Sequence, residues 1–292
     1  MLYSELITEL RRETRDLKYK MEENFDGDGT TATFVLKHHP VVENSQQILV
    51  SGVLKSTPAQ YAWDADMGEI VFITSEIPPS VANNVLIDYR YCNFNDADWV
   101  NFINNGIEFY GERLWKEILD NTTFTTVLNQ FEYDLTTMTS GNKVFRLVDA
   151  WYKTASNAQA RWIAISTSLN VRFFRDSRKL HLNPPFRQSG YPMQIRAIRK
   201  PNTFTTTSAT LDLSDEEIKC IKEYAKYQYY MSIAALKTSD LSALSKDPTV
   251  SPARDLLAIA KMSRDNAEAI CHRIKKPYPA QHISNVMEGI TS

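Results

Sequence analysis

Glycine, cysteine and histidine are all scarce in this sequence of 292 residues, with 9, 3 and 5 copies respectively. Nucleotide-binding loops depend on closely spaced glycines, so the low glycine content argues against such a loop. The three cysteines, Cys92, Cys220 and Cys271, are far apart and form no Cys-x-x-Cys pair, which excludes a zinc ribbon or a thioredoxin-like motif. We therefore expect reduced cysteines in a protein made in the cytoplasm.

Long apolar runs and a large net charge are also missing. No run approaches the ~20 apolar residues of a membrane span. The N-terminal segment MLYSELITELRRETRDLKYK carries charges from its fifth residue on, so it does not resemble a signal peptide. The 33 basic and 35 acidic residues give a formal net charge of −2, which argues against a strong nucleic-acid binder with a basic surface.

Short catalytic and metal-binding motifs are missing as well. The chain has no Gly-x-Ser-x-Gly, no P-loop and no His-Glu-x-x-His. NFDGDG at 24–29 resembles the start of a calcium loop, but loop position 12 is Val35 instead of a bidentate glutamate, so a solvated Asx/Gly turn is the better interpretation. We expect no catalytic residue, no metal and no cofactor, although an enzyme without a short signature stays open.

Hydrophobic periodicity alternates between helical and strand-like blocks. Residues 4–20 carry an amphipathic helical stripe, and residues 31–91 are short segments rich in β-branched and aromatic residues. The helical period returns with Asp96 as the expected N-cap and continues to Ile118, and residues 131–200 are again strand-like.

Two further helices are expected near the C-terminus. Ser214 and Glu217 form a Ser-x-x-Glu capping box before an apolar run. Ser251 and Pro252 supply an N-cap and a proline at the first helical position of the next helix. The remaining tail has two prolines and no strong period, so we expect it to be extended.

The predicted fold class is α+β, with a helical body of about four main helices, two inserted antiparallel β-modules and an extended C-terminal tail. The expected boundaries are 1–23, 93–130 and 205–275 for a discontinuous, ring-forming helical body, 24–92 and 131–204 for the two β-modules, and 276–292 for the tail.

Each predicted β-module contains a double proline. GEIVFITSEIPPSVANNVLIDYRY at 68–91 and RKLHLNPPFRQSGYPMQIRAI at 178–198 both read as a strand, a proline pair and a second strand. Proline does not occur within central strands, so we expect two hairpins of similar shape. Whether they share an ancestor stays open, because the connections differ in length.

The most basic stretch is RFFRDSRK at 172–179, and it is a candidate patch for DNA or for a protein interface through four residues: Arg172, Arg175, Arg178 and Lys179. Basic residues interleaved with aromatic ones suit single-stranded nucleic acid. In a strand and turn they more often form one solvated face and one packed face, so both interpretations remain.

The order of these elements resembles the head-to-tail connector (adaptor, neck or head-completion) proteins of tailed bacteriophages. The similarity is carried by the opening helix ELITELRRETRD, the β-module ending in NNVLIDYRY, and the capped helix in NFNDADWVNFINNGIEFYGERLWKEI. The run from FEYDL to IRKPNTF followed by LDLSDEEIKCIKEYAKYQYY fits the same group. The resemblance covers most of residues 1–275 as a pattern of elements.

This resemblance implies a virion structural protein of the neck, located between capsid and tail and made in the host bacterial cytoplasm. Its copies would form a ring, typically of twelve, beneath the portal protein. The ring would extend the channel for DNA, which passes without specific binding, and would dock a tail or nozzle protein, with no membrane involved. The resemblance also points to the C-terminal tail as the portal contact, through five candidates: Lys275, Lys276, Tyr278, Pro279 and His282.

A carbohydrate-binding or baseplate (tail) component is the alternative. In that case Trp63, Trp151 and Trp162 on the two β-modules would stack on sugars. Sugar-binding modules of this kind are mostly all-β, so the helical blocks favour the connector.

Overall fold

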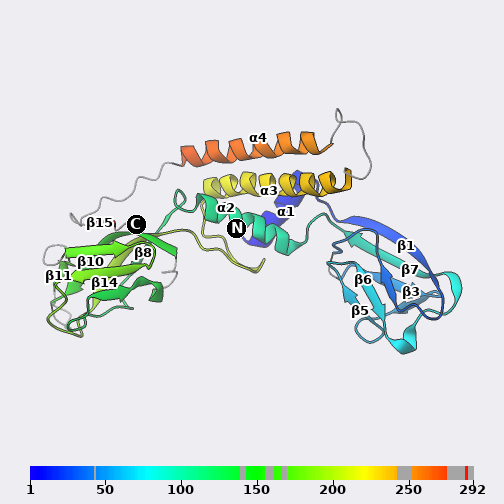
Figure 1. The fold of residues 1–292 in the computed structure, drawn as a ribbon, viewed down its shortest axis with the longest axis horizontal. Coiled ribbons are helices and arrows are strands. Elements are labelled where there is room, and N and C mark those ends of the chain that lie inside the picture. Colours follow the sequence, from blue (N-terminus) through cyan, green and yellow to red (C-terminus); the bar gives the residue numbers. More distant parts are fainter. Residues whose placement is uncertain are drawn as a thin grey trace. The chain divides into compact units, whose positions relative to one another are not determined.

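The computed structural model describes residues 1–42, 44–138, 143–154, 161–165, 170–241, 252–274 and 287–288 (Figure 1). The helices are α1 (Tyr3–Thr14), α2 (Asp96–Tyr110), α3 (Asp215–Leu241) and α4 (Pro252–Arg273). The strands are β1 (Tyr19–Gly27), β2 (Thr33–Val35), β3 (Gln47–Val50), β4 (Val53–Lys55), β5 (Tyr61–Asp64), β6 (Glu69–Phe72), β7 (Val81–Tyr91), β8 (Lys116–Asp120), β9 (Glu132–Asp134), β10 (Val144–Lys153), β11 (Trp162–Ala164), β12 (Asn170–Phe174), β13 (Lys179–Asn183), β14 (Met193–Arg199) and β15 (Met287–Glu288).

The chain divides into two compact units, and α2, α3 and α4 each contribute residues to both. Unit 1 comprises Met1–Phe102, Thr205–Thr210 and Ala225–Met262, and unit 2 comprises Ile103–Phe204, Leu211–Tyr224 and Ser263–Ser292. Each unit contains two sheets and a hydrophobic cluster of its own.

Unit 1 contains the sheets β1-β7-β3-β4 and β2-β6-β5, in which neighbouring strands are antiparallel. The long strand β7 pairs with β1 on one side and β3 on the other, with Ile48 opposite Ile87 (Figure 1). Alternate residues of these strands are buried, as expected for sheets with one covered face. The cluster takes residues from both sheets: Phe34, Leu36, Val41, Ile48, Val50, Tyr61, Ile70, Phe72, Val85, Ile87 and Tyr89.

Unit 2 contains the sheets β11-β10-β14-β8 and β15-β12-β13-β9. The pairs β10–β14, β14–β8 and β12–β13 are antiparallel, and β12 pairs with β15 in parallel. Strand β10 has two register shifts against β14, which bend a strand locally. The cluster again takes residues from both sheets, among them Tyr133, Leu147, Ala150, Val171, Phe173, Leu180, Leu182, Ile195 and Ala197.

The predicted dominance of a helical body is wrong. Among the described residues, strands and helices occupy nearly equal shares, about 33% and 32%, and these strands build four sheets. One reason is that the helix expected over 4–20 ends at Thr14, where Arg15 adopts a left-handed φ of 59°. Residues from Tyr19 onward form β1, and β7 pairs with it along most of its length. Charged side chains are frequent along β1, and the segment contains no β-branched residue. The sequence therefore gives no strong indication of a strand at this position.

The helix that was expected to continue to Ile118 also ends early, at Tyr110. A Cβ on the next residue, Gly111, would lie 2.6 Å from the carbonyl oxygen of Ile107, so glycine permits this tight helix end. The chain then forms β8, in which Ile118 lies opposite Ala197 of β14. The helix start also differs by one residue from the prediction, because Asn95 and Asp98 form the reciprocal capping contacts.

The double prolines do not form hairpins, contrary to the prediction. Pro78-Pro79 connects β6 to β7, and these two strands belong to different sheets of unit 1. Pro184-Pro185 connects β13 to β14, which belong to different sheets of unit 2. Each proline pair therefore lies where the chain crosses from one sheet to the other, a position without ladder hydrogen bonds to lose.

Candidate functional site

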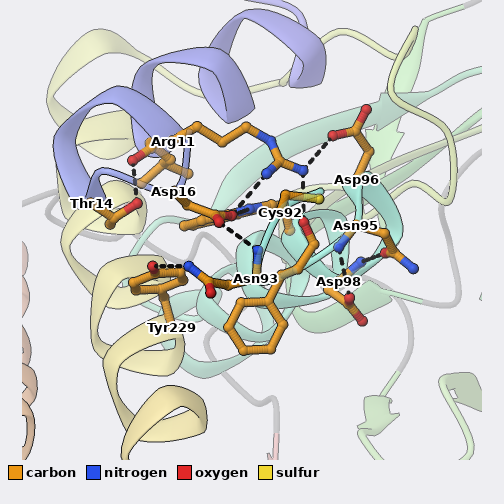
Figure 2. A network of polar contacts seen from close by, with 12 residues as sticks. Arg11, Thr14, Asp16, Cys92, Asn93, Asn95, Asp96, Asp98 and Tyr229 are labelled. Atoms are coloured by element: carbon orange, nitrogen blue, oxygen red, sulfur yellow. Dashed lines mark hydrogen bonds and ion pairs between the residues drawn. The ribbon is translucent and has the colours of Figure 1, made fainter. Parts of the chain in front are cut away.

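A fully buried carboxylate, Asp16, is the centre of a polar network in unit 1 (Figure 2). Its Oδ2 accepts hydrogen bonds from Arg11 Nη1 at 2.8 Å and from Trp99 Nε1 at 3.0 Å. Its Oδ1 accepts from the backbone nitrogen of Asn93 at 2.8 Å. The donors come from α1, α2 and the segment that follows β7, so one side chain holds three parts of unit 1 together.

The guanidinium of Arg11 binds further acceptors in the same network. Its Nη2 donates to Asp96 Oδ1 and to the carbonyl of Phe94, each at 2.8 Å (Figure 2). Burial acts to lower the pKa of Arg11, but the hydrogen bond to Asp96 and the charge of Asp16 outweigh burial, and the pKa is raised. The guanidinium of Arg11 therefore stays charged, and its buried ion pair with Asp16 and its contact with Asp96 tie α1 to the start of α2.

A cavity of about 510 Å³ lies beside this network. Arg11, Cys92 and Asp96 line it, together with Lys18 and Trp63. Cys92 is buried, and burial raises the pKa of its thiol, which disfavours the reactive thiolate. Two basic side chains, Arg11 and Lys18, line the cavity with three acidic ones: Asp64, Asp66 and Asp96. We assign this cavity no ligand.

The predicted basic stretch lies on β12, β13 and the turn between them. Arg172 lies on β12 and Lys179 on β13. Lys179 Nζ donates to Glu132 Oε2 at 2.8 Å, and this hydrogen bond raises the pKa of Lys179 and lowers that of Glu132. Arg175 and Arg178, on the turn, line a separate cavity of about 290 Å³ in unit 2. The structure thus divides the predicted patch into two strand residues and two cavity residues.

The cavity at the turn also brings in basic residues from distant parts of the sequence. Lys143 precedes β10 and Lys200 follows β14, and the Nζ atoms of both contact the carboxylate of Glu108. Burial acts to raise the pKa of Glu108, but the hydrogen bond and charge of Lys143 and the charge of Lys200 outweigh burial, and the pKa is lowered. We call this site the basic cavity; its lining residues are Glu108, Glu112, Lys143, Val144, Phe145, Arg175, Arg178 and Lys200.

The sequence did not indicate Lys143 and Lys200 as site residues, because each is a single lysine at the end of a strand. Antiparallel pairing places Val144 opposite Arg199, and the backbone nitrogen of Lys200 donates to the carbonyl of Lys143 at 3.0 Å. The strand-like pattern of both segments was visible in the sequence, but their register was not. Only the register could have indicated that the two lysines are neighbours.

The tryptophans considered for sugar binding and the residues expected to dock the portal lie outside both cavity walls or outside the described residues, except Trp63, which lines the larger cavity. Of the three tryptophans considered for sugar binding, Trp63 and Trp151 are half-buried and Trp162 is 41% exposed. Lys153 Nζ lies 5.3 Å from the centroid of the Trp162 ring, where it covers part of that surface. The five expected portal-docking residues lie outside the described residues: Lys275, Lys276, Tyr278, Pro279 and His282.

The turn expected over residues 24–29 is confirmed only at its end, because residues 24–27 belong to β1 and the Asx turn begins at Asp28. The carboxylate of Asp28 accepts hydrogen bonds from the side chain and backbone of Thr31 and from the backbone of Thr30, and these lower its pKa. Asp26 Oδ1 accepts from the backbone nitrogen of Asn83 at 2.6 Å. Across the described residues, no group of three or more His, Cys, Asp or Glu side chains is placed to hold a metal ion. None of the helices described is long and apolar enough to span a bilayer.

Comparison with known proteins adds no family. Neither a scan against protein-family models nor a search of the curated proteins found a match.

Proposed function

We propose that the chain is a virion structural protein that forms an adaptor ring between the portal and the tail of a tailed bacteriophage. The proposal rests on the order of elements, which resembles that of connector proteins. Its main structural support is an exposed apolar surface on α3 and α4. The ring would extend the DNA channel and provide a docking platform for tail proteins.

We use the name helical apolar surface for the exposed large apolar side chains in the unit 1 parts of α3 and α4. Those of α4 lie on more than one side of the helix, because Leu257 and Ile259 are two positions apart. They are 37% to 58% exposed: Met231, Leu236, Leu257, Ile259 and Met262. The small Ala260 is buried in the same part of α4, and Ser263, the first residue of the unit 2 part, is buried as well. A helix on the surface of a monomer usually buries its large apolar residues instead. Exposed apolar surface of this kind is typical of protein–protein contacts.

A neighbouring copy of the same chain is the proposed occupant of this surface. In a ring, each copy contacts its two neighbours through two different faces, so part of each subunit's surface must be apolar before assembly. The formal net charge of −2 allows copies to approach without strong mutual repulsion. It also suits a channel through which DNA passes without being held.

Light scattering of the purified protein, alone and with the portal protein of the same genome, tests the proposal. We expect a closed oligomer, either alone or on the portal. The double variant Leu257→Glu/Met262→Glu should remain folded by circular dichroism but fail to assemble. Leu54→Glu is the matched control, because Leu54 is 63% exposed on β4, outside the helical apolar surface. A wild-type chain that stays monomeric with portal present would contradict the proposal.

The C-terminal tail remains the proposed portal contact. A chain that ends at Ile274 retains α4 in full. It lacks all five candidate docking residues and also β15, which pairs with β12 at only two positions. We expect this truncated chain to fold and to lose portal binding in a pull-down experiment. Undiminished binding would exclude the tail as the anchor and leave the ring proposal itself unaffected.

A further inference from the structure

The basic cavity of unit 2 has an excess of positive charge that the proposed adaptor role does not use. Four basic and two acidic side chains line it, which leaves two positive charges in excess. The rest of its lining includes the aromatic ring of Phe145. A concave site with charges of one sign attracts and concentrates ions of the opposite sign.

The two carboxylates of the cavity pair with three of its four basic side chains. Glu108 contacts both lysines, and Glu112 is paired with Arg175. No carboxylate within the described part of the chain pairs with Arg178, and its buried Nε has no hydrogen-bond partner there. A half-buried guanidinium without a counter-charge is unfavourable, and a bound anion would supply that charge.

Contacts hold the backbone of Arg178 and the side chain of Arg175 before any ligand binds. Arg178 has a left-handed φ of 53°, which is uncommon for a residue with a side chain, and its carbonyl accepts a hydrogen bond from the backbone of Leu135 at 3.0 Å. The guanidinium of Arg175 lies 5.8 Å from the centroid of the Phe145 ring, a cation–π contact. Prior fixation reduces the entropy that a ligand must overcome on binding.

Lys200 offsets the partial negative charge at the C-terminal end of α2. Helix carbonyls in the last turn carry partial negative charge, and they would repel an anion. Lys200 Nζ lies 3.4 Å from the carbonyl oxygen of Glu108 in that turn. A Cβ on Gly111 would come within 3.0 Å of the Lys200 side chain, so glycine allows the lysine to lie across the helix end.

We propose that the basic cavity binds a phosphate group, as inorganic phosphate or as a phosphate monoester. A monoester carries about −1.5 to −2 charges at neutral pH, which matches the excess of two positive charges. Arginine offers paired N–H donors that fit phosphate oxygens. The volume of about 290 Å³ admits a phosphate together with part of the group that carries it.

Titration calorimetry of the full chain with inorganic phosphate, at constant ionic strength, tests this site. Arg178→Gln should weaken binding about tenfold, because a charge-assisted hydrogen bond is lost. Lys179→Gln and Arg172→Gln are matched controls, since they remove the same charge from the same stretch but outside the cavity lining. We expect both controls to bind within about twofold of the wild type.

A second variant tests whether the positive charge of the cavity drives phosphate binding. Glu112→Gln removes a negative charge from the cavity wall and should tighten phosphate binding several-fold. Melting curves of all variants check that each one folds. The absence of binding at millimolar phosphate, or equal losses in Arg178→Gln and Lys179→Gln, would overturn the proposal.

A competition experiment identifies the source of the phosphate group. A short single-stranded oligonucleotide with a 5′-phosphate should displace inorganic phosphate from the wild type, and the same strand without a 5′-phosphate should not. Equal displacement by both strands would show that backbone diesters bind, and the assignment to a monoester would then be wrong.

Discussion

Trp99 donates its indole hydrogen bond to Asp16 and stacks on Tyr229, with ring centroids 5.1 Å apart and planes 14° from parallel. The hydroxyl of Tyr229 accepts a hydrogen bond from Asn93 Nδ2 at 3.2 Å (Figure 2). These residues therefore bury aromatic surface and satisfy their polar atoms at the same time. Within unit 1 they join α2, α3 and the end of α1 into one interdependent cluster.

The substitution Asp16→Ala is expected to lower the free energy of unfolding by about 3–5 kcal/mol, because it breaks a buried charge pair with Arg11. Urea unfolding measures this loss. The pair of the exposed Lys20 and the half-buried Asp88, with N and O 2.7 Å apart, supplies the control, and Lys20→Ala should cost less than about 1 kcal/mol. Similar losses for the two variants would contradict the structural role of the network.

Asn84 connects the first double-proline crossing to the sheet. Its Oδ1 accepts from the backbone nitrogen of Gly27 at 2.8 Å, and its Nδ2 donates to the carbonyl of Pro79 at 2.9 Å. Asn84→Asp keeps the acceptor but places an oxygen against the Pro79 carbonyl, so we expect a loss of about 1–3 kcal/mol in thermal or urea unfolding. Asn83→Asp, at the exposed neighbouring position, should have little effect; a loss as large as that of Asn84→Asp would contradict the assignment.

The lowered pKa of Glu108 predicts a pH dependence of stability. Burial acts to raise this pKa, but Lys143 and Lys200 lower it below the usual value of 4.5. The group therefore contributes stability above that value, and the contribution is lost as the pH falls through the lower pKa of the folded state. Urea unfolding between about pH 5 and pH 3 should show a smaller decline for Glu108→Gln than for the wild type.

Lys143→Gln is the companion variant for this pH experiment. It removes the hydrogen bond and charge that lower the pKa of Glu108 most strongly, so it should also reduce the decline. A variant Glu108→Gln with the full wild-type decline would show that other carboxyl groups cause the acid sensitivity.

Features that depend on a few consecutive residues were predictable from the sequence. The loop from Asp64 to Gly68 joins β5 and β6 as a hairpin, with Asp64 opposite Glu69. The predicted capping box at α3 is confirmed, because the backbone nitrogen of Ser214 donates to Glu217 at 2.6 Å. In both cases the side chain and the backbone group that it satisfies lie within five positions, so local chemistry decides the structure.

Features that depend on distant partners were not predictable. β1 is rich in charged residues and is a strand because β7 pairs with it from Tyr19 to Gly27. The basic cavity gathers its residues only through the pairing of β10 with β14 and the end of α2. No periodicity within either segment encodes which strand will become its neighbour, so register and cavity composition could not be derived.

The strand β8, which replaces a predicted helix, can be tested through Lys116 and the fully buried Glu217. Lys116 Nζ lies 3.0 Å from Glu217 Oε2. Lys116→Met keeps the side-chain length but removes the counter-charge, so we expect urea unfolding to show a loss of about 3–5 kcal/mol. The double variant Lys116→Met/Glu217→Gln should recover part of the loss, since a neutral amide needs no counter-charge. If Lys116→Met alone were as stable as the wild type, this ion pair and the placement of β8 beside the start of α3 would both be wrong.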